Sequence, residues 1–200
     1  GIMKDYWEEG GSIQWFAQVN TPKENPDEWR RWLKDSAKLG ATGAYIHGGA
    51  VDFWFAEKRW DTFHEAVSLM REYGIKAVGM AGHNPEAHKW IRDNLDIDFH
   101  MCCYYNPTDR SQNPHHQSSG EKWNDEDREN MLAFIPTAKT PVIHYKVLAG
   151  GNKAVIPSFE RLSTTMREQD VVCIGMYLGD DPDMITKNVK LIDEYVEKKQ

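Results

Sequence analysis

The sequence predicts an α/β fold built around a parallel sheet. Six short apolar segments, each followed by a segment of helical character, alternate along the 200 residues. The apolar segments begin about 32 residues apart on average, which is the spacing of strand–helix units whose strands run parallel. These segments are apolar almost throughout, as expected where both faces of a sheet are covered. No linker-like stretch interrupts the pattern, so residues 1–200 are predicted to form a single domain.

Helix-capping residues bound several of the predicted elements. Asn25-Pro26, Asn84-Pro85 and Asp181-Pro182 each combine a capping side chain with a proline, which is favoured at the first helical position. Gly40 and Gly74 follow helical segments, at positions where glycine often ends a helix. After a helix end within residues 1–11, the predicted strands are 12–20, 42–48, 75–81, 98–105, 141–149 and 171–178, and the predicted helices are 25–40, 61–73, 84–95, 125–138, 158–169 and 181–198.

Two parallel architectures are compatible with this order. The turn after the first strand, QVNTPKENP, contains no glycine, whereas a doubly wound sheet usually has a glycine-rich phosphate turn there. A closed barrel of eight units needs about 200 residues or more, and six units already occupy this chain. We therefore predict a parallel (β/α) barrel-type chain with six βα units, whose first two units are missing or supplied elsewhere.

The order of glycine-ended helices and short turns over residues 12–198 resembles the C-terminal three quarters of a (β/α)8 barrel, the TIM-barrel superfamily. The segment Tyr145-Lys146-Val147-Leu148, followed by Gly175-Met176-Tyr177, is also similar to uncharacterised bacterial TIM-barrel proteins. This resemblance implies a fold and carries over no activity. If two units are absent, the open sheet edges are expected to be covered by a homo-oligomer or by a second chain that completes the barrel, or to result from truncation of the chain.

Composition argues against several classes of partner. The net charge is -7 and no window forms a basic face, so a nucleic-acid surface is not expected. No apolar run approaches the roughly 20 residues that span a bilayer, so no membrane partner is expected either. The three cysteines, Cys102, Cys103 and Cys173, form neither a disulfide framework nor a metal knuckle, which favours a reducing compartment such as the cytoplasm.

A lysine interrupts the apolar run PVIHYKVLAGG at 141–151. Burying an ammonium group costs several kcal/mol unless it is paired or reaches a polar cavity. Lys146 is therefore predicted to open on a site, either as an amine nucleophile or as an anchor for a negative charge, with a structural ion pair as the alternative. His144 lies two residues earlier and is expected on the same face of the strand.

Polar residues follow the other predicted strands at their C-terminal ends, where ligands bind in parallel α/β folds. His47 precedes two glycines, and His83 precedes the Asn84 cap, so both are acid/base candidates beside Lys146. The predicted catalytic residues are thus Lys146, His47 and His83, and the predicted substrate-binding residues are Gln18, Asp52, Tyr105, Asn106, His144 and Tyr177.

These residues predict an enzyme that acts on a small polar substrate, carbohydrate-like or carboxylate-like, with lyase or aldolase chemistry at Lys146. A second hypothesis is a metal-dependent hydrolase or isomerase, in which His47, His83 and His144 with Asp52 would bind a divalent metal. The usual barrel metal patterns, such as paired histidines on one strand, are absent from the sequence, so no residue is assigned as a metal ligand. A third hypothesis is a non-catalytic binding or assembly subunit.

Overall fold

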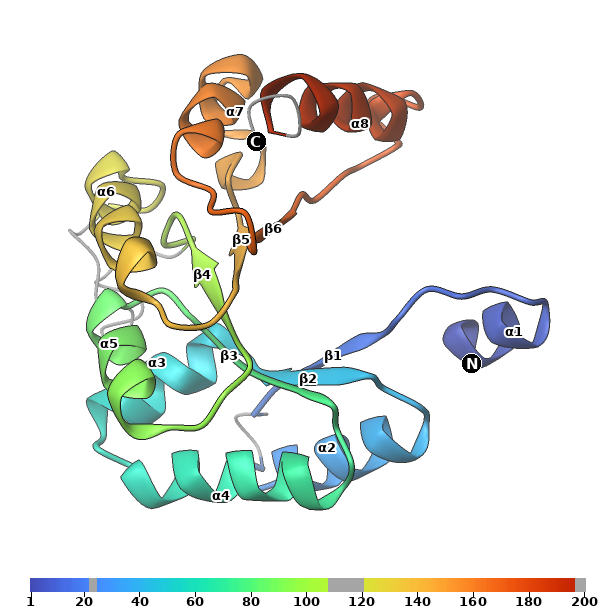
Figure 1. Cartoon of the computed structure of the whole chain (residues 1–200), viewed down its shortest axis with the longest axis vertical. Coiled ribbons are helices and arrows are strands. Elements are labelled where there is room, and N and C mark those ends of the chain that lie inside the picture. The colour runs from blue at the N-terminus through green and yellow to red at the C-terminus, as the bar shows by residue number, and fades with distance from the viewer. Residues whose placement is uncertain (22–24, 108–120, 197–200) are drawn as a thin grey trace.

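Six parallel strands form one curled sheet in the computed structural model, which describes residues 1–21, 25–107 and 121–196 (Figure 1). Neighbours in the sheet are neighbours in the chain, so every crossover advances by one strand in the same direction. A doubly wound sheet would reverse direction at a switch point, whereas this order curls into the wall of a barrel. The predicted (β/α) barrel-type fold is therefore confirmed. The strands are β1 Phe16–Val19, β2 Gly43–Ile46, β3 Ala77–Gly82, β4 Phe99–Cys103, β5 Val142–Tyr145 and β6 Val171–Cys173.

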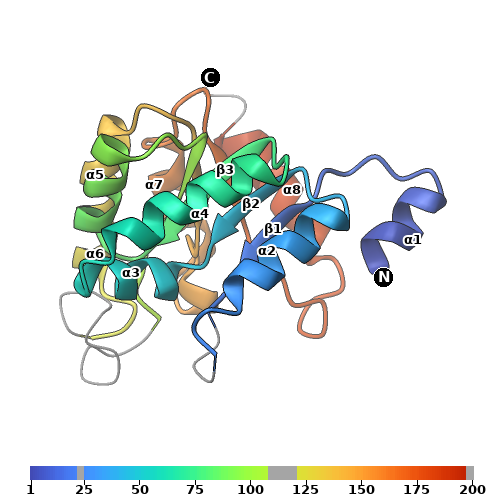
Figure 2. The same ribbon diagram turned by 90° about the horizontal axis from the view of Figure 1, so that it is seen from below.

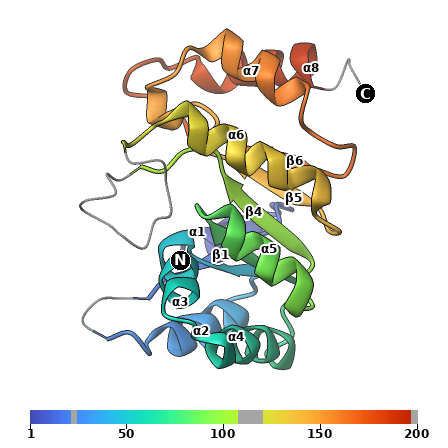
Figure 3. The same cartoon turned by 90° about the vertical axis from the view of Figure 1, so that its left-hand side faces the viewer.

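Helices cover the convex side of this sheet. Figure 1 shows α2 and α4 beneath the sheet, Figure 2 shows the same two helices in front of it, and Figure 3 shows the helices stacked from α4 at the bottom to α7 at the top. None of the helices in the described ranges is both long enough and apolar enough to span a bilayer. The helices are α1 Ile2–Glu8, α2 Trp29–Lys38, α3 Gly48–Ala56, α4 Trp60–Glu72, α5 Pro85–Asn94, α6 Asp125–Phe134, α7 Val155–Ser163 and α8 Met184–Tyr195, with 3-10 turns η1 Ile135–Thr137 and η2 Ala149–Gly151.

Each strand separates two apolar layers. On β5, Val142 packs into the core between sheet and helices, whereas Ile143 and Tyr145 face the concave interior with Phe99 of β4. This is the alternation of side chains that a pleated strand imposes. Consecutive residues on one strand therefore pack into different layers.

Small and large side chains interdigitate on the concave side. A Cβ on Gly79 would lie 2.2 Å from the ring of Phe99, so a glycine is needed where that ring crosses β3. The same ring lies 5.4 Å from the ring of Phe16 on β1, between centroids. The aromatic residues thus fill the curve of the sheet only because a neighbouring strand has no side chain there.

Both edges of the sheet expose interior side chains. Phe16 on β1 is 37% exposed and Val171 on β6 is 52% exposed. Within the described residues no strand pairs with the outer side of β1 or of β6. The barrel wall is open along these two strands.

Several predicted boundaries differ from the structure. Asn84 caps α5 by accepting a hydrogen bond from the backbone N–H of Glu86, as predicted. The predicted cap at Asn25 was wrong, because residues 25–28 form a turn and α2 begins at Trp29. Helix α3 was not predicted, since its residues are nearly all apolar and carry no helical periodicity. Strand β5 ends at Tyr145 because Lys146 adopts a φ of 56°, outside the extended region.

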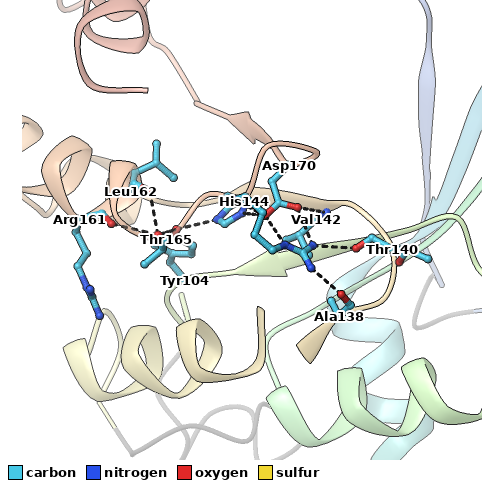
Figure 4. A network of polar contacts seen from close by, with 10 residues as sticks. Tyr104, Ala138, Thr140, Val142, His144, Arg161, Leu162, Thr165 and Asp170 are labelled. Carbon is cyan, nitrogen blue, oxygen red and sulfur yellow. Dashed lines mark hydrogen bonds and ion pairs between the residues drawn. The ribbon is translucent and has the colours of Figure 1, made fainter. Parts of the chain in front are cut away.

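A buried polar network connects β4, β5 and the turn before β6 (Figure 4). The hydroxyl of Tyr104 donates to Nδ1 of His144 at 2.8 Å, and Nε2 of His144 donates to Asp170 at 3.2 Å. Asp170 also accepts from the guanidinium of Arg167, at 2.7 Å, and from the backbone N–H of Val142, at 2.9 Å. Burial alone would raise the pKa of Asp170, but these donors outweigh it and hold the pKa below its ordinary value.

Replacing Asp170 by alanine is expected to lower the free energy of unfolding by about 3–5 kcal/mol, because Arg167 and His144 lose their buried anionic partner. Chemical denaturation at neutral pH measures this change. Asp193→Ala, at an exposed position of α8, is the control and should change stability by less than about 0.5 kcal/mol. Equal stabilities of the two variants would show that the network does not stabilise the fold.

Candidate functional site

Asp52 and His83 form the centre of a polar cluster at the C-terminal ends of the strands. Helix α3 follows β2 directly and carries Asp52 to the end of β3, where His83 begins the next turn. Oδ2 of Asp52 accepts from Nδ1 of His83 at 2.7 Å. Oδ1 accepts from the backbone N–H groups of His83, at 3.1 Å, and Asn84, at 3.3 Å. One carboxylate therefore orients both the imidazole ring and the turn that carries it.

Lys146 reaches this cluster because the strand ends at Tyr145. Its φ of 56° breaks the alternation of β5, and its Nζ lies 3.3 Å from Nε2 of His83. A non-glycine residue at positive φ is uncommon, and such conformations concentrate at functional sites. The unusual backbone conformation brings the amine to the imidazole.

The proton between these two nitrogens determines their chemistry. An ammonium group has no lone pair, so a hydrogen bond between Nζ and Nε2 requires one uncharged partner. Burial disfavours a charged His83, but the neighbouring Cys103 and Asp52 outweigh it and raise the pKa of His83 to about 9. At neutral pH His83 therefore holds a proton, and its Nε2 faces Nζ of Lys146.

Cys103 and Tyr145 complete the cluster on the concave side. They are paired across β4 and β5, and Sγ of Cys103 donates to the carbonyl of Tyr105 at 2.9 Å. The ring of Tyr145 lies 6.4 Å from that of His83, between centroids. Burial, with Cys103 and Asp52 nearby, raises the pKa of Tyr145, so its hydroxyl remains protonated and can donate a hydrogen bond.

A glycine lets these groups approach one another. A Cβ on Gly48 would lie 3.0 Å from Cε1 of His83 and 3.1 Å from the hydroxyl of Tyr145. His47, immediately before it, caps α3 by accepting the backbone N–H of Gly49 at 3.2 Å. Burial, and the nearby His83 and Lys146, lower the pKa of His47, so this second imidazole is uncharged at neutral pH.

A cavity of about 700 Å³ opens beside Lys146. It lies between the connection from β5 to α7, the connection from β6 to α8, and helix α8 itself. Tyr145 and Lys146 line one part of it, and Tyr177 lines another. The amine thus faces a volume large enough for a small organic molecule.

The structure brings Lys146, His83, His47 and Asp52 together, and places Tyr177 on the adjoining cavity. Other predicted site residues have different surroundings. Gln18 accepts from the hydroxyl of Tyr45 on the open concave face, and Tyr105 accepts from Arg128. Asn106 is buried, and its carbonyl accepts from the backbone N–H of Trp123.

His144 does not share a face with Lys146, so the prediction from strand parity was wrong. His144 faces the helix side of β5 and is held there by Tyr104 and Asp170. Parity applies only while the backbone stays extended, and the positive φ of Lys146 turns its side chain to the opposite side. The proposed ligand set of His47, His83, His144 and Asp52 is thereby divided between two layers. Among residues 1–21, 25–107 and 121–196, no group of three or more His, Cys, Asp or Glu side chains is arranged to hold a metal ion.

Cys103 and Tyr145 were not predicted as site residues. Both lie at the C-terminal end of an apolar strand, and a buried Cys or Tyr in such a strand reads as core. The sequence did contain one signal for Tyr145. It directly precedes Lys146, and in a strand its side chain faces the opposite side from that of His144. The pairing of Cys103 with Tyr145 depends on the register of two strands, which the sequence does not state.

Replacing Asp52 by asparagine is expected to lower the pKa of His83 from about 9, because the neutral amide no longer favours the imidazolium. Histidine NMR titration measures it. A folded-state pKa above the ordinary 6.5 means that His83 stabilises the fold fully below pH 6.5 and that this contribution is lost as pH rises through about 9. In Asp52→Asn the free energy of unfolding should no longer fall between pH 6.5 and about 9 through His83, whereas in Asp193→Asn it should still fall. An unchanged titration in Asp52→Asn would refute the assigned pairing.

Comparisons with known proteins leave the family open. No protein-family model and no curated protein matches the sequence. An aldo-keto reductase, AKR11C1 from Bacillus halodurans in its holo form, is 12% identical over 96% of this chain and 79% of that chain, with a TM-score of 0.49. An HPPK-DHPS structure in complex with substrates is 11% identical over 92% of this chain and 39% of that chain, with a TM-score of 0.48. Likenesses at this level assign no activity to the cluster, which is therefore interpreted from its own geometry on a partial (β/α) barrel.

Proposed function

We propose that this protein is an enzyme that acts on the carbonyl group of a small substrate, with Lys146 as the amine nucleophile of lyase-like or aldolase-like chemistry. The observation that carries this proposal is the 3.3 Å contact between Nζ of Lys146 and Nε2 of His83. A free amine beside a proton donor is the arrangement that Schiff-base formation requires. The cavity next to Lys146 provides space for the substrate.

The proposed reaction begins with attack of the Lys146 lone pair on the carbonyl carbon. A C–N bond forms, the carbonyl π electrons move to oxygen, and that oxygen takes up the proton from Nε2 of His83. The nitrogen of the resulting adduct returns a proton to Nε2. His83 then delivers a proton to the hydroxyl group, which leaves as water and generates an iminium ion. The iminium accepts the electron pair of a bond broken next to it, and hydrolysis of the product releases the amine.

The neighbouring groups have distinct proposed roles. Asp52 is a positioning residue, because it holds Nδ1 of His83 and so directs Nε2 toward the amine. Tyr145 supplies a protonated hydroxyl on the concave side, where it can donate to a developing alkoxide. His47 is uncharged at neutral pH and can accept a proton at the same strand ends.

Incubation with phenylacetaldehyde and borohydride is expected to trap a stable secondary amine on Lys146, because hydride reduces the iminium ion. Peptide mass spectrometry locates the adduct. Lys146→Met should abolish it, and His83→Gln should slow its formation by about 10²–10⁴-fold. Lys190→Met, at an exposed position of α8, is the control and should label like the native protein. Absence of an adduct on Lys146 would reject the proposed chemistry.

A second proposal concerns assembly. The outer sides of β1 and β6 are unpaired within the described residues, and Val171 exposes 52% of its surface although it faces the interior. Helix α8 also exposes Ile185 at 48% and Val189 at 51%. We propose that residues 1–200 form one domain and that another copy or a second chain supplies the strands that cover these edges.

Sedimentation velocity at micromolar concentration is expected to show self-association of the purified protein. Val171→Lys should shift the population toward monomer, because the lysine places a charge on the uncovered strand. Lys76→Ala, at an exposed position before β3, should leave the distribution unchanged. A native protein that remains monomeric would exclude the second copy and favour a different chain as the partner.

A further inference from the structure

The cavity beside Lys146 has a mainly apolar wall. Side chains from the two connections and from α8 line it, namely Val147, Leu148, Ile174, Met176, Met184 and Leu191. A polyhydroxylated molecule would lose hydrogen bonds to water on entering such a cavity and would regain few of them. The lining therefore suits a ligand with an apolar body, which differs from the carbohydrate-like or carboxylate-like substrate that the sequence suggested.

One buried polar side chain interrupts this wall. Asn188 lies on α8 between Met184 and Leu191, at the spacing that puts all three on one helical face, and all three line the cavity. Asn188 is only 8% exposed, and its side chain forms no hydrogen bond with any residue that the structure describes. Its amide atoms are not among the fully buried side-chain atoms without a partner in the described residues, so the amide remains accessible from the cavity. A ligand in the cavity can therefore hydrogen-bond to Asn188.

The charges around the cavity disfavour an anionic ligand. Nζ of Lys187 donates to Asp181 at 2.7 Å, so that cation is already paired. Asp180 also lines the cavity and forms no ion pair within the described part of the chain. In the proposed function Lys146 acts as a free amine, and the remaining charge near the cavity is then that of Asp180, which is negative. A carboxylate or phosphate would be repelled, whereas an uncharged ligand would not.

We infer that the substrate is an uncharged carbonyl compound with an apolar body and a hydroxyl group, and that Asn188 recognises this hydroxyl. The amide of Asn188 can donate and accept, as a hydroxyl group can, so the two groups match. The attachment of the carbonyl end to Lys146 rests on the proposed function. The preference for an uncharged ligand rests on it as well, whereas recognition of the hydroxyl group by Asn188 does not, because it needs no covalent step.

Two alcohols test recognition separately from chemistry. Tyrosol carries a phenolic hydroxyl on an apolar body, phenethyl alcohol lacks it, and neither has a carbonyl that could form an iminium ion. In calorimetric titrations the native protein is expected to bind tyrosol about tenfold more tightly than phenethyl alcohol, the factor for one net hydrogen bond. Phenylacetate, an anion of similar size, should bind more weakly than either alcohol.

Asn188→Leu keeps the volume of the side chain and removes its hydrogen bonds. It should weaken tyrosol binding about tenfold and leave phenethyl alcohol binding unchanged. Lys190→Ala, two residues away on the exposed side of α8, is the matched control and should bind both alcohols like the native protein. If Asn188 has only a structural role, Asn188→Leu should weaken the binding of both alcohols equally, and this result would overturn the inference.

The native protein decides the question even if Asn188→Leu does not fold. Equal affinities for tyrosol and phenethyl alcohol, no binding of either, or tighter binding of phenylacetate would each overturn the inference. Discrimination between the alcohols without a borohydride adduct on Lys146 would support the inference and reject the proposed carbonyl chemistry. An adduct on Lys146 without discrimination between the alcohols would support the proposed carbonyl chemistry and overturn the inference about Asn188.

Discussion

The buried carboxylate of Asp52 is the group on which the strand-end cluster depends. It accepts hydrogen bonds from the ring of His83 and from two backbone N–H groups of the turn after β3. A carboxylate with no exposed side-chain surface is tolerable only when its oxygens are satisfied in this way. The same interactions keep His83 protonated and aim its second nitrogen at Lys146. The position of His83 against the amine therefore depends on a carboxylate carried by α3, a helix that the sequence pattern did not predict.

The curled sheet makes these contacts possible by separating two apolar layers. The helix-side layer buries the network of Tyr104, His144 and Asp170, which holds β4, β5 and the turn before β6 in position. The concave layer contains Phe99 and Tyr145 and leads to the strand ends. Two histidine systems of similar composition therefore have different consequences. The His144 system is enclosed by its partners, whereas the His83 system borders a cavity through Lys146.

The cavity refines the chemistry that the cluster supports. The carbonyl chemistry proposed for Lys146 says nothing about the rest of the substrate molecule. The proposal about the rest of the substrate is based on the apolar wall, on the amide of Asn188 and on Asp180, which forms no ion pair within the described residues. Each acts through desolvation or charge rather than through reactivity. In the two proposals, substrate recognition and reaction type therefore depend on different residues, on α8 and on the strand ends respectively.

The sequence by itself determined the alternation of strands and helices, the parallel sheet, the cap at Asn84 and the cluster members His47, His83 and Lys146. These follow from local patterns, because apolar runs report burial and polar residues after parallel strands meet at one edge. Only the tertiary structure decided that α3 brings Asp52 to His83 and that Cys103 lies opposite Tyr145. It also decided that the positive φ of Lys146 separates this residue from His144. The physical reason is that these contacts join residues distant in the chain, through the curl of the sheet and one unusual backbone angle, and no local periodicity records either.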